Sequence, residues 1–89
     1  MSYQIKTAPE VQKELKALPV YVRAQAYQMI DTLASNPRPH KAKELRGKPG
    51  FYRIWLAGRW RIVYSINDET QIVRIIRVRS KATIDYESL

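Results

Sequence analysis

The stretch that decides the fold is FYRIWLAGRWRIVY, Phe51–Tyr64, in which two runs with a period of two flank a short turn. Alternating aromatic and branched aliphatic residues are typical of β-strands. The pattern therefore predicts an antiparallel hairpin with one strand over 51–56 and the next over 60–66. A strand that only packs in a core has little use for charge, yet three arginines interrupt the two runs. They are Arg53, Arg59 and Arg61.

Two helices are predicted upstream of this hairpin. Pro9 suits the first turn of a helix, and apolar residues then recur at helical spacing through residue 18. Pro19 separates this helix from a longer one over 20–35, which ends at the proline-rich stretch 36–39. The apolar residues expected on the buried side of the second helix are Val20, Ala24, Tyr27, Ile30 and Leu33.

Two further strands complete the predicted fold. Residues 3–7 and 71–79 alternate, whereas residues 36–50 form a polar, basic connection. The order strand, helix, helix and three strands predicts one α+β domain over 1–89, with two helices on one face of a mostly antiparallel four-stranded sheet. The strand residues expected to face the helices are Ile54, Leu56, Trp60, Ile62, Tyr64, Ile66, Ile72, Ile76 and Val78.

The opposite parity of the strands carries charge. It contains Arg53, Trp55, Arg61, Arg77 and Arg79, with no acidic residue among them. Like charges on neighbouring strands cost stability, so several together indicate an anion to be bound. Guanidinium groups suit phosphate, and aromatic rings stack on bases, which favours single-stranded nucleic acid. The alternative is a solvated strand face whose long side chains cover apolar surface.

The distribution of charge supports an anionic partner. The chain has sixteen Lys and Arg against eight Asp and Glu, a formal net charge of +8. Residues 38–81 hold twelve of the basic residues and three of the acidic ones, whereas residues 1–37 hold four and three. A basic excess gathered in one part of a small chain is typical of proteins that bind nucleic acid or another polyanion.

Several kinds of site find no support in the sequence. The chain has no cysteine and a single histidine, His40, so neither a disulfide framework nor a metal-ligand spacing is present. We therefore expect no metal and no cofactor. The sequence shows no signal-peptide pattern and no run of about 18 apolar residues, so we expect a cytoplasmic protein without a membrane partner.

A resemblance to a known family rests on the predicted order of elements and on three segments: KELRGKPGFYRI, RWRIVY and IIRVRSKATIDY. In these features the chain resembles the RelE-like toxins of bacterial type II toxin–antitoxin pairs, within the RelE/ParE superfamily. The resemblance covers nearly the whole chain. It implies a fold like that of microbial ribonucleases and cleavage of messenger RNA in the ribosomal A site, with the 2′-OH as nucleophile and no metal. It also implies three partners: a cognate antitoxin, the ribosome and messenger RNA.

The resemblance implies a catalytic set of four residues. Arg53 stands where the family has a basic residue after the strand tyrosine, and Arg61 matches the arginine of the R-[I/L]-V-Y strand. Lys81 lies near the arginine that follows the last strand, and Tyr86 matches a C-terminal tyrosine. Trp55 replaces a residue that is usually Lys or Arg, which leaves the general base open. The alternative for Tyr86 is that it packs the tail on the sheet.

RNA binding is assigned to Trp55 and to six further basic residues of this half of the chain: Lys43, Arg46, Lys48, Arg59, Arg77 and Arg79. Two other functions stay open. One is a ParE-like toxin that acts on DNA gyrase, and the other is a non-catalytic module that binds RNA or the ribosome. Retention of Arg61, a basic residue at 53 and Tyr86 favours the ribonuclease.

Overall fold

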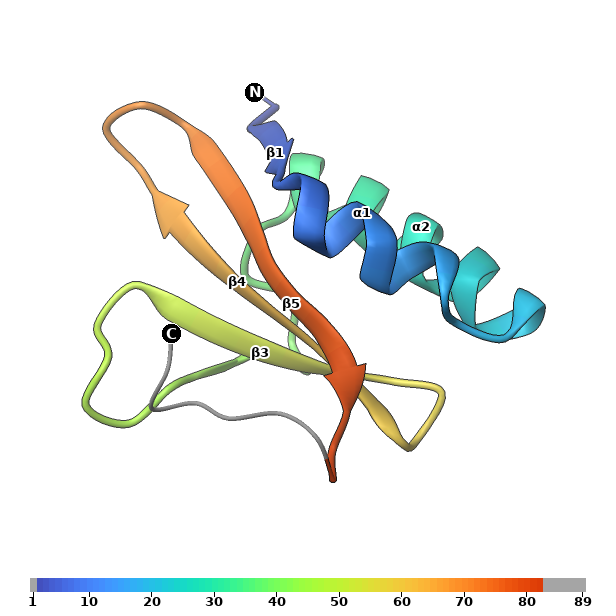
Figure 1. The fold of residues 1–89 in the computed structure, drawn as a ribbon. Coiled ribbons are helices and arrows are strands. Elements are labelled where there is room, and N and C mark those ends of the chain that lie inside the picture. The colour runs from blue at the N-terminus through green and yellow to red at the C-terminus, as the bar shows by residue number, and fades with distance from the viewer. Residues whose placement is uncertain (1, 83–89) are drawn as a thin grey trace.

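The computed structural model, which describes residues 2–82, places two helices on one face of a twisted sheet (Figure 1). This confirms the predicted α+β class and the helix-on-sheet arrangement. Among the described residues, neither helix is long and apolar enough to cross a membrane. The elements in chain order are β1 (Gln4–Thr7), α1 (Pro9–Lys16), α2 (Val20–Ser35), β2 (Lys43–Glu44), β3 (Phe51–Leu56), β4 (Trp60–Asn67) and β5 (Ile72–Ser80).

Within residues 2–82 the sheet has five strands in the order β1-β5-β4-β3-β2. The β1–β5 pair is parallel and the other pairs are antiparallel, as expected for a mostly antiparallel sheet. The strand that the sequence did not predict is β2, which lies inside the basic connection and pairs Lys43 with Arg53 and Glu44 with Tyr52. Two residues are too few to show an alternation, so this edge strand had no periodic signal.

The core lies between the helices and the sheet. From α1 it takes Val11 and Leu15, as predicted, and from the central strands Ile54, Ile62 and the fully buried Tyr64. These residues alternate along β3 and β4, so the predicted parity of the hairpin is confirmed.

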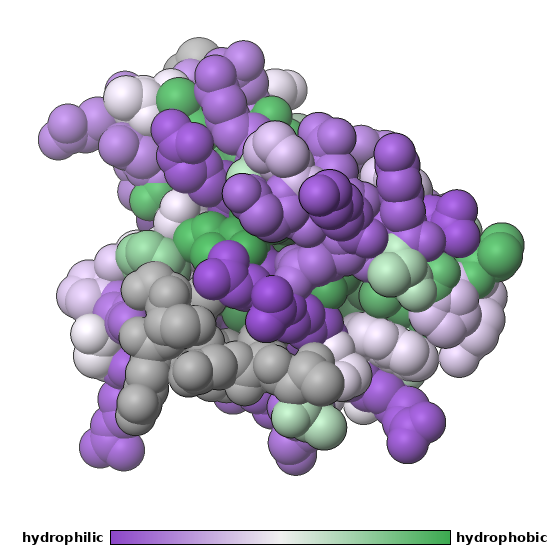
Figure 2. Space-filling view, in the orientation of Figure 1, coloured by the Kyte–Doolittle hydropathy of each residue, from purple (hydrophilic) through white to green (hydrophobic). Residues whose placement is uncertain are grey.

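The second helix turns a different side toward the core than predicted in its N-terminal half, whereas Ile30 and Leu33 are buried as expected. That half is apolar on two sides, and only one of them packs into the core. Val20 and Tyr27, expected inside, are 77% and 48% exposed, and Ala24 is exposed too. Figure 2 accordingly shows apolar surface at the end of the helix pair where α1 turns into α2. The buried residues of α2 are Val22, Ala26, Ile30 and Leu33.

A β-bulge changes the alternation of β5. Val63 of β4 pairs with Arg77, but the next residue, Tyr64, pairs with Ile75, so Ile76 is left over. An extra residue in one strand moves all residues on its far side to the opposite face. The residues of β5 that are buried against the helices are Val73, Ile75 and Val78.

The bulge corrects the prediction for β5. Ile72 and Ile76 were expected to face the helices, but both lie outside the main core and are half-buried. Arg74 shares their parity and projects from the face away from the helices. There it is opposite Lys6 of β1 in the parallel register.

A polar cluster ties together four segments at one end of the sheet. Arg38, after α2, forms a bidentate ion pair with Asp68 of the β4–β5 turn, with contacts of 2.8 and 3.1 Å. The Tyr3 hydroxyl donates to Asp68 Oδ1 at 2.7 Å, and Arg38 Nε donates to the Tyr52 hydroxyl at 3.1 Å. The hydrogen bonds from Arg38 and then from Tyr3 lower the pKa of the Asp68 carboxyl.

We expect Asp68→Asn to lower the thermal unfolding midpoint at about pH 7. We also expect the midpoint of the variant to change less than that of the parent as the pH falls into the acid range. The folded-state pKa of Asp68 is depressed, so its stabilising effect is present above the unfolded value of about 3.9 and is lost as pH falls through the folded value. The difference in unfolding midpoint between the parent and the variant should therefore be smaller at about pH 3 than at about pH 7. Glu69→Gln, in the same exposed turn, is the control. An equal difference in midpoint at both pH values would show that the charge of Asp68 does not stabilise the fold.

Candidate nucleic-acid interface

The sheet register brings predicted site residues from four strands onto one surface. Lys43 lies opposite Arg53, which lies opposite Val63 and, beyond it, Arg77. One step along the sheet, Trp55 lies opposite Arg61 and, beyond it, Arg79. We call the surface formed by Lys43, Arg53, Trp55, Arg61 and Arg77 the basic face. It points away from the helices because the residues that alternate with it are in the core.

Trp55 is the centre of this surface. The guanidinium carbon of Arg61 lies 4.1 Å from the centroid of its ring, and Nζ of Lys81 lies 5.6 Å from it. Both distances are within the range in which a ring attracts a cation. The Trp55 ring therefore holds together two of the cations in the implied catalytic set, while 37% of the residue stays exposed.

An apolar floor lies under the basic face. Val63 is fully buried, yet it does not belong to the main core, because its neighbours Ile62 and Tyr64 are the residues of β4 that face the helices. In the register it sits between the half-buried Arg53 and Arg77. Charged groups interact more strongly with an anion when water is partly excluded from around them.

Arg79, assigned to RNA binding, forms an ion pair with the carboxylate of Glu14. β1 covers β5 only as far as Ile75, so the next part of β5 has an open edge. Glu14 of α1 fills it: Oε1 accepts the Val78 N–H at 3.0 Å, and Oε2 accepts from Arg79 Nε. Arg79 is therefore held at the edge of the sheet by an ion pair that the sequence did not reveal, since Glu14 lies 65 positions away.

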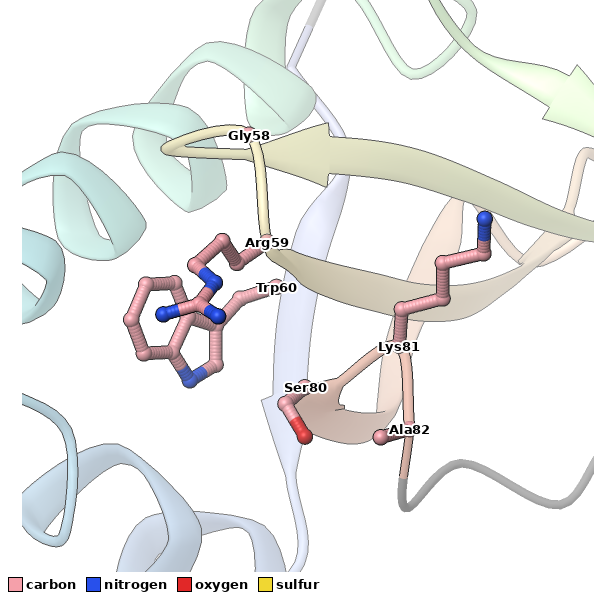
Figure 3. A pocket seen from close by; sticks show the side chains of 6 residues that line it. All are labelled: Gly58, Arg59, Trp60, Ser80, Lys81 and Ala82. Atoms are coloured by element: carbon pink, nitrogen blue, oxygen red, sulfur yellow. The ribbon is translucent and has the colours of Figure 1, made fainter.

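A hollow of about 750 Å³ lies where the β3–β4 turn meets the end of β5. Figure 3 shows the Arg59 side chain beside the Trp60 ring in this hollow, whereas the Lys81 side chain points the other way, and the Arg59 carbonyl accepts the Lys81 N–H at 2.8 Å. Arg59 is thus separate from the Trp55 group. The described residues that line the hollow are Gly58, Arg59, Trp60, Ser80, Lys81 and Ala82.

The loop between β2 and β3 carries Arg46 and Lys48. It is closed by the Leu45 N–H, which donates to the Phe51 carbonyl at 2.7 Å, and by the Gly50 N–H, which donates to Glu44 Oε2 at 3.0 Å. This loop precedes β3, whereas Trp55 lies near the other end of that strand, roughly 13 Å away at about 3.3 Å per residue. Arg46 and Lys48 are therefore not brought to the Trp55 group.

Tyr86 lies outside the described residues. Within residues 2–82, no three side chains of the types that bind metal ions lie together. Two cations that the sequence did not single out, Lys6 and Arg74, lie on the same side of the sheet as the basic face. The bulge that puts Arg74 there has no signature in the sequence that could have revealed it.

Comparisons with known proteins give a consistent result. Residues 5–84 match the family model described as the ParE toxin of the type II toxin–antitoxin system parDE. A RelE-like toxin protein of Escherichia coli is 31% identical, over all of this chain and 94% of its own length. A mutant of the E. coli RelE toxin in the free state superposes with a TM-score of 0.79 at 30% identity, covering 93% of this chain and 88% of that one. The toxin in the intact E. coli RelBE toxin–antitoxin complex superposes with a TM-score of 0.78 at 31% identity, covering 89% and 96%.

Proposed function

The chain belongs to the RelE/ParE family and is a RelE-like toxin of a type II toxin–antitoxin pair, and from that premise we propose that it is a metal-independent endoribonuclease. Its substrate is messenger RNA in the A site of the ribosome, and its cleavage stops translation. The observation that carries this proposal is the cluster of Arg61 and Lys81 around the Trp55 ring, on a face where Arg53 is in the adjacent row.

The proposed reaction uses the RNA's own nucleophile. The 2′-oxygen gives up its proton and forms a bond to the adjacent phosphorus, the bond from phosphorus to the 5′-oxygen breaks, and that oxygen takes up a proton. Arg61 and Arg53 stabilise the negative charge that grows on the phosphoryl oxygens, because guanidinium groups remain protonated and donate two bonds in one plane. We assign the proton transfers to Lys81 and, by family resemblance alone, to Tyr86.

The ribosome supplies what the basic face lacks. An open, half-exposed surface holds a flexible strand loosely, while alignment of nucleophile and phosphate is worth roughly 7–11 kcal/mol in favourable cases. A codon held by the ribosome is already ordered when Arg53, Arg61 and Lys81 meet it. We therefore place the activity on translating ribosomes rather than on free RNA.

A cognate antitoxin is the second proposed partner. The structural relatives include RelBE complexes from E. coli and Mycobacterium tuberculosis, the latter with a TM-score of 0.77 at 25% identity. The net charge of +8 favours a partner segment rich in Asp and Glu, since opposite charges steer association and raise its rate. Such a segment on the basic face would exclude RNA from it.

We expect cleavage of messenger RNA on translating ribosomes and little or none of the same RNA when it is free. The test is primer extension on both substrates, using protein treated with a chelator. Cuts in the A-site codon that persist after chelation support the proposal. Efficient cutting of free RNA, or activity restored only by stoichiometric metal, contradicts the mechanism. Inhibition of DNA supercoiling without RNA cleavage would instead indicate a gyrase toxin.

A further inference from the structure

Two cations that take no part in the proposed chemistry face each other on the first and last strands. Lys6 of β1 and Arg74 of β5 are partners in the parallel register, and both are exposed. Arg77, on the far side of the bulge, lies on the same side of the sheet, and its Nη1 donates to the carbonyl of the leftover residue Ile76 at 2.8 Å. The bulge therefore gathers three cations that a regular strand would have divided between two faces.

These cations line a hollow of about 440 Å³ where β1 ends and the chain turns into α1. Glu10, in the first turn of α1, also lines the hollow. Among residues 2–82, however, neither Lys6 nor Arg74 forms an ion pair with it or with another carboxylate. Like charges placed side by side cost stability, and here no direct ion pair within residues 2–82 offsets that cost.

Lys6 and Arg74 continue the basic face along the sheet beyond Arg77, which already belongs to it. Arg61 pairs with Arg79 and Ser65 pairs with Arg74, so the two rows are four residues apart along β4. At about 3.3 Å per residue, this separation is roughly 13 Å. Arg77, opposite Val63, lies between these two rows. Each of the three rows between Trp55 and Lys6 thus carries at least one cation.

We propose that Lys6, Arg74 and Arg77 form a second phosphate-binding site, which holds the RNA backbone several nucleotides away from the cleaved bond. This inference rests on the proposed function and extends it from the reacting phosphate to a track along the strand. A charged track with an aromatic platform at one end is typical of surfaces that bind single strands. RNA suits this stretch because its cations lie on the same side of the sheet as Trp55 and Arg61, in rows that follow one another along β4.

The test compares two double variants that lose the same charge. Lys6→Gln with Arg74→Gln removes the second site, and Lys13→Gln with Lys16→Gln removes two exposed lysines of α1 on the helix side. Binding is measured by fluorescence anisotropy with a labelled single strand of about 12 nucleotides and with one of about 4, both carrying 2′-O-methyl groups that prevent cleavage. Each titration is repeated over a series of salt concentrations.

We expect the Lys6/Arg74 variant to bind the longer strand on the order of tenfold more weakly in about 0.1 M salt. Its plot of log K against log salt should flatten by about 0.7 for each lost contact. The shorter strand, which spans only the Trp55 group, should bind both variants equally, and the Lys13/Lys16 variant should bind the longer strand like the parent. Circular dichroism checks that both variants are folded.

The outcomes separate this site from the proposed function. If the Lys6/Arg74 variant binds the longer strand with the affinity and salt slope of the parent, the site is refuted even when the parent cuts RNA on the ribosome. The same holds if it loses affinity only for the cognate antitoxin, because the cations would then serve a protein. If the expected losses are seen but the parent cuts no RNA, the second site stands and the nuclease fails.

Discussion

Arg61→Ala is expected to lose roughly 100-fold or more of the rate of A-site cleavage, the scale of removing one donor aimed at the charge of a transition state. The guanidinium of Arg61 lies on the Trp55 ring at the centre of the basic face, where it can reach a phosphate over that ring. The fold should survive, because Arg61 lies outside the main core and its cation–π contact with Trp55 contributes about 0.5–1 kcal/mol. Single-turnover primer extension on programmed ribosomes measures the rate.

Two further variants identify what Arg61 contributes. Arg61→Lys keeps the charge but not the planar pair of donors, so it should recover part of the rate and not all of it. Lys16→Ala removes an exposed positive charge from α1 and should cleave like the parent. If folded Arg61→Ala cleaves at the parental rate, the role given to Arg61 is wrong.

Tyr64→Ala is expected to unfold most of the protein at moderate temperature. Tyr64 is fully buried, its ring stacks on that of Tyr52 at a centroid distance of 5.8 Å, and its hydroxyl donates to the Pro37 carbonyl at 2.8 Å. Replacing a large buried aromatic ring by alanine costs about 3–5 kcal/mol, a large share of the stability of a small domain. Burial also raises the pKa of this phenol, so it stays neutral over the ordinary pH range.

Tyr64→Phe separates the ring from its hydroxyl. It keeps the packing and loses one hydrogen bond, so we expect a cost of about 1 kcal/mol, somewhat more if the Pro37 carbonyl finds no other donor. Urea unfolding followed by circular dichroism measures both variants. Equal stability of Tyr64→Phe and Tyr64→Ala would show that the ring contributes nothing beyond its hydroxyl, contrary to its burial.

The sequence predicted those parts of the fold that depend on local patterns. The period of two in 51–56 and 60–66 and the two prolines, Pro9 and Pro19, placed the hairpin and both helices close to their observed bounds. The buried side of α2 was missed in its N-terminal half, because Val20 and Val22 are equally apolar and only packing chooses between them, whereas Ile30 and Leu33 were predicted correctly. The local pattern of apolar residues cannot show which of two apolar sides of a helix is buried, because tertiary contacts determine this.

In the candidate site, too, the sequence predicted what depends on local pattern and missed what depends on contacts between distant residues. Parity along β3 and β4 was enough to put Arg53, Trp55 and Arg61 on one face. Three features depend on pairs far apart in the sequence: the carboxylate of Glu14 on Arg79, the leftover residue of β5, and Lys6 beside Arg74. No periodicity within a single segment carries that information, so these features required the structure.

The parallel pairing of β1 with β5 also determines when the row of cations from Trp55 to Lys6 is completed. Gln4 pairs with Ile72, so β1 stays unpaired until β5 has been synthesised. Contacts between such distant residues slow folding, because a long loop must close before they contribute. The β4–β5 hairpin can bring Arg61 and Arg77 together by itself, but Lys6 joins them only when β1 pairs with β5. A chain whose synthesis has not reached β5 therefore cannot carry the whole row of cations.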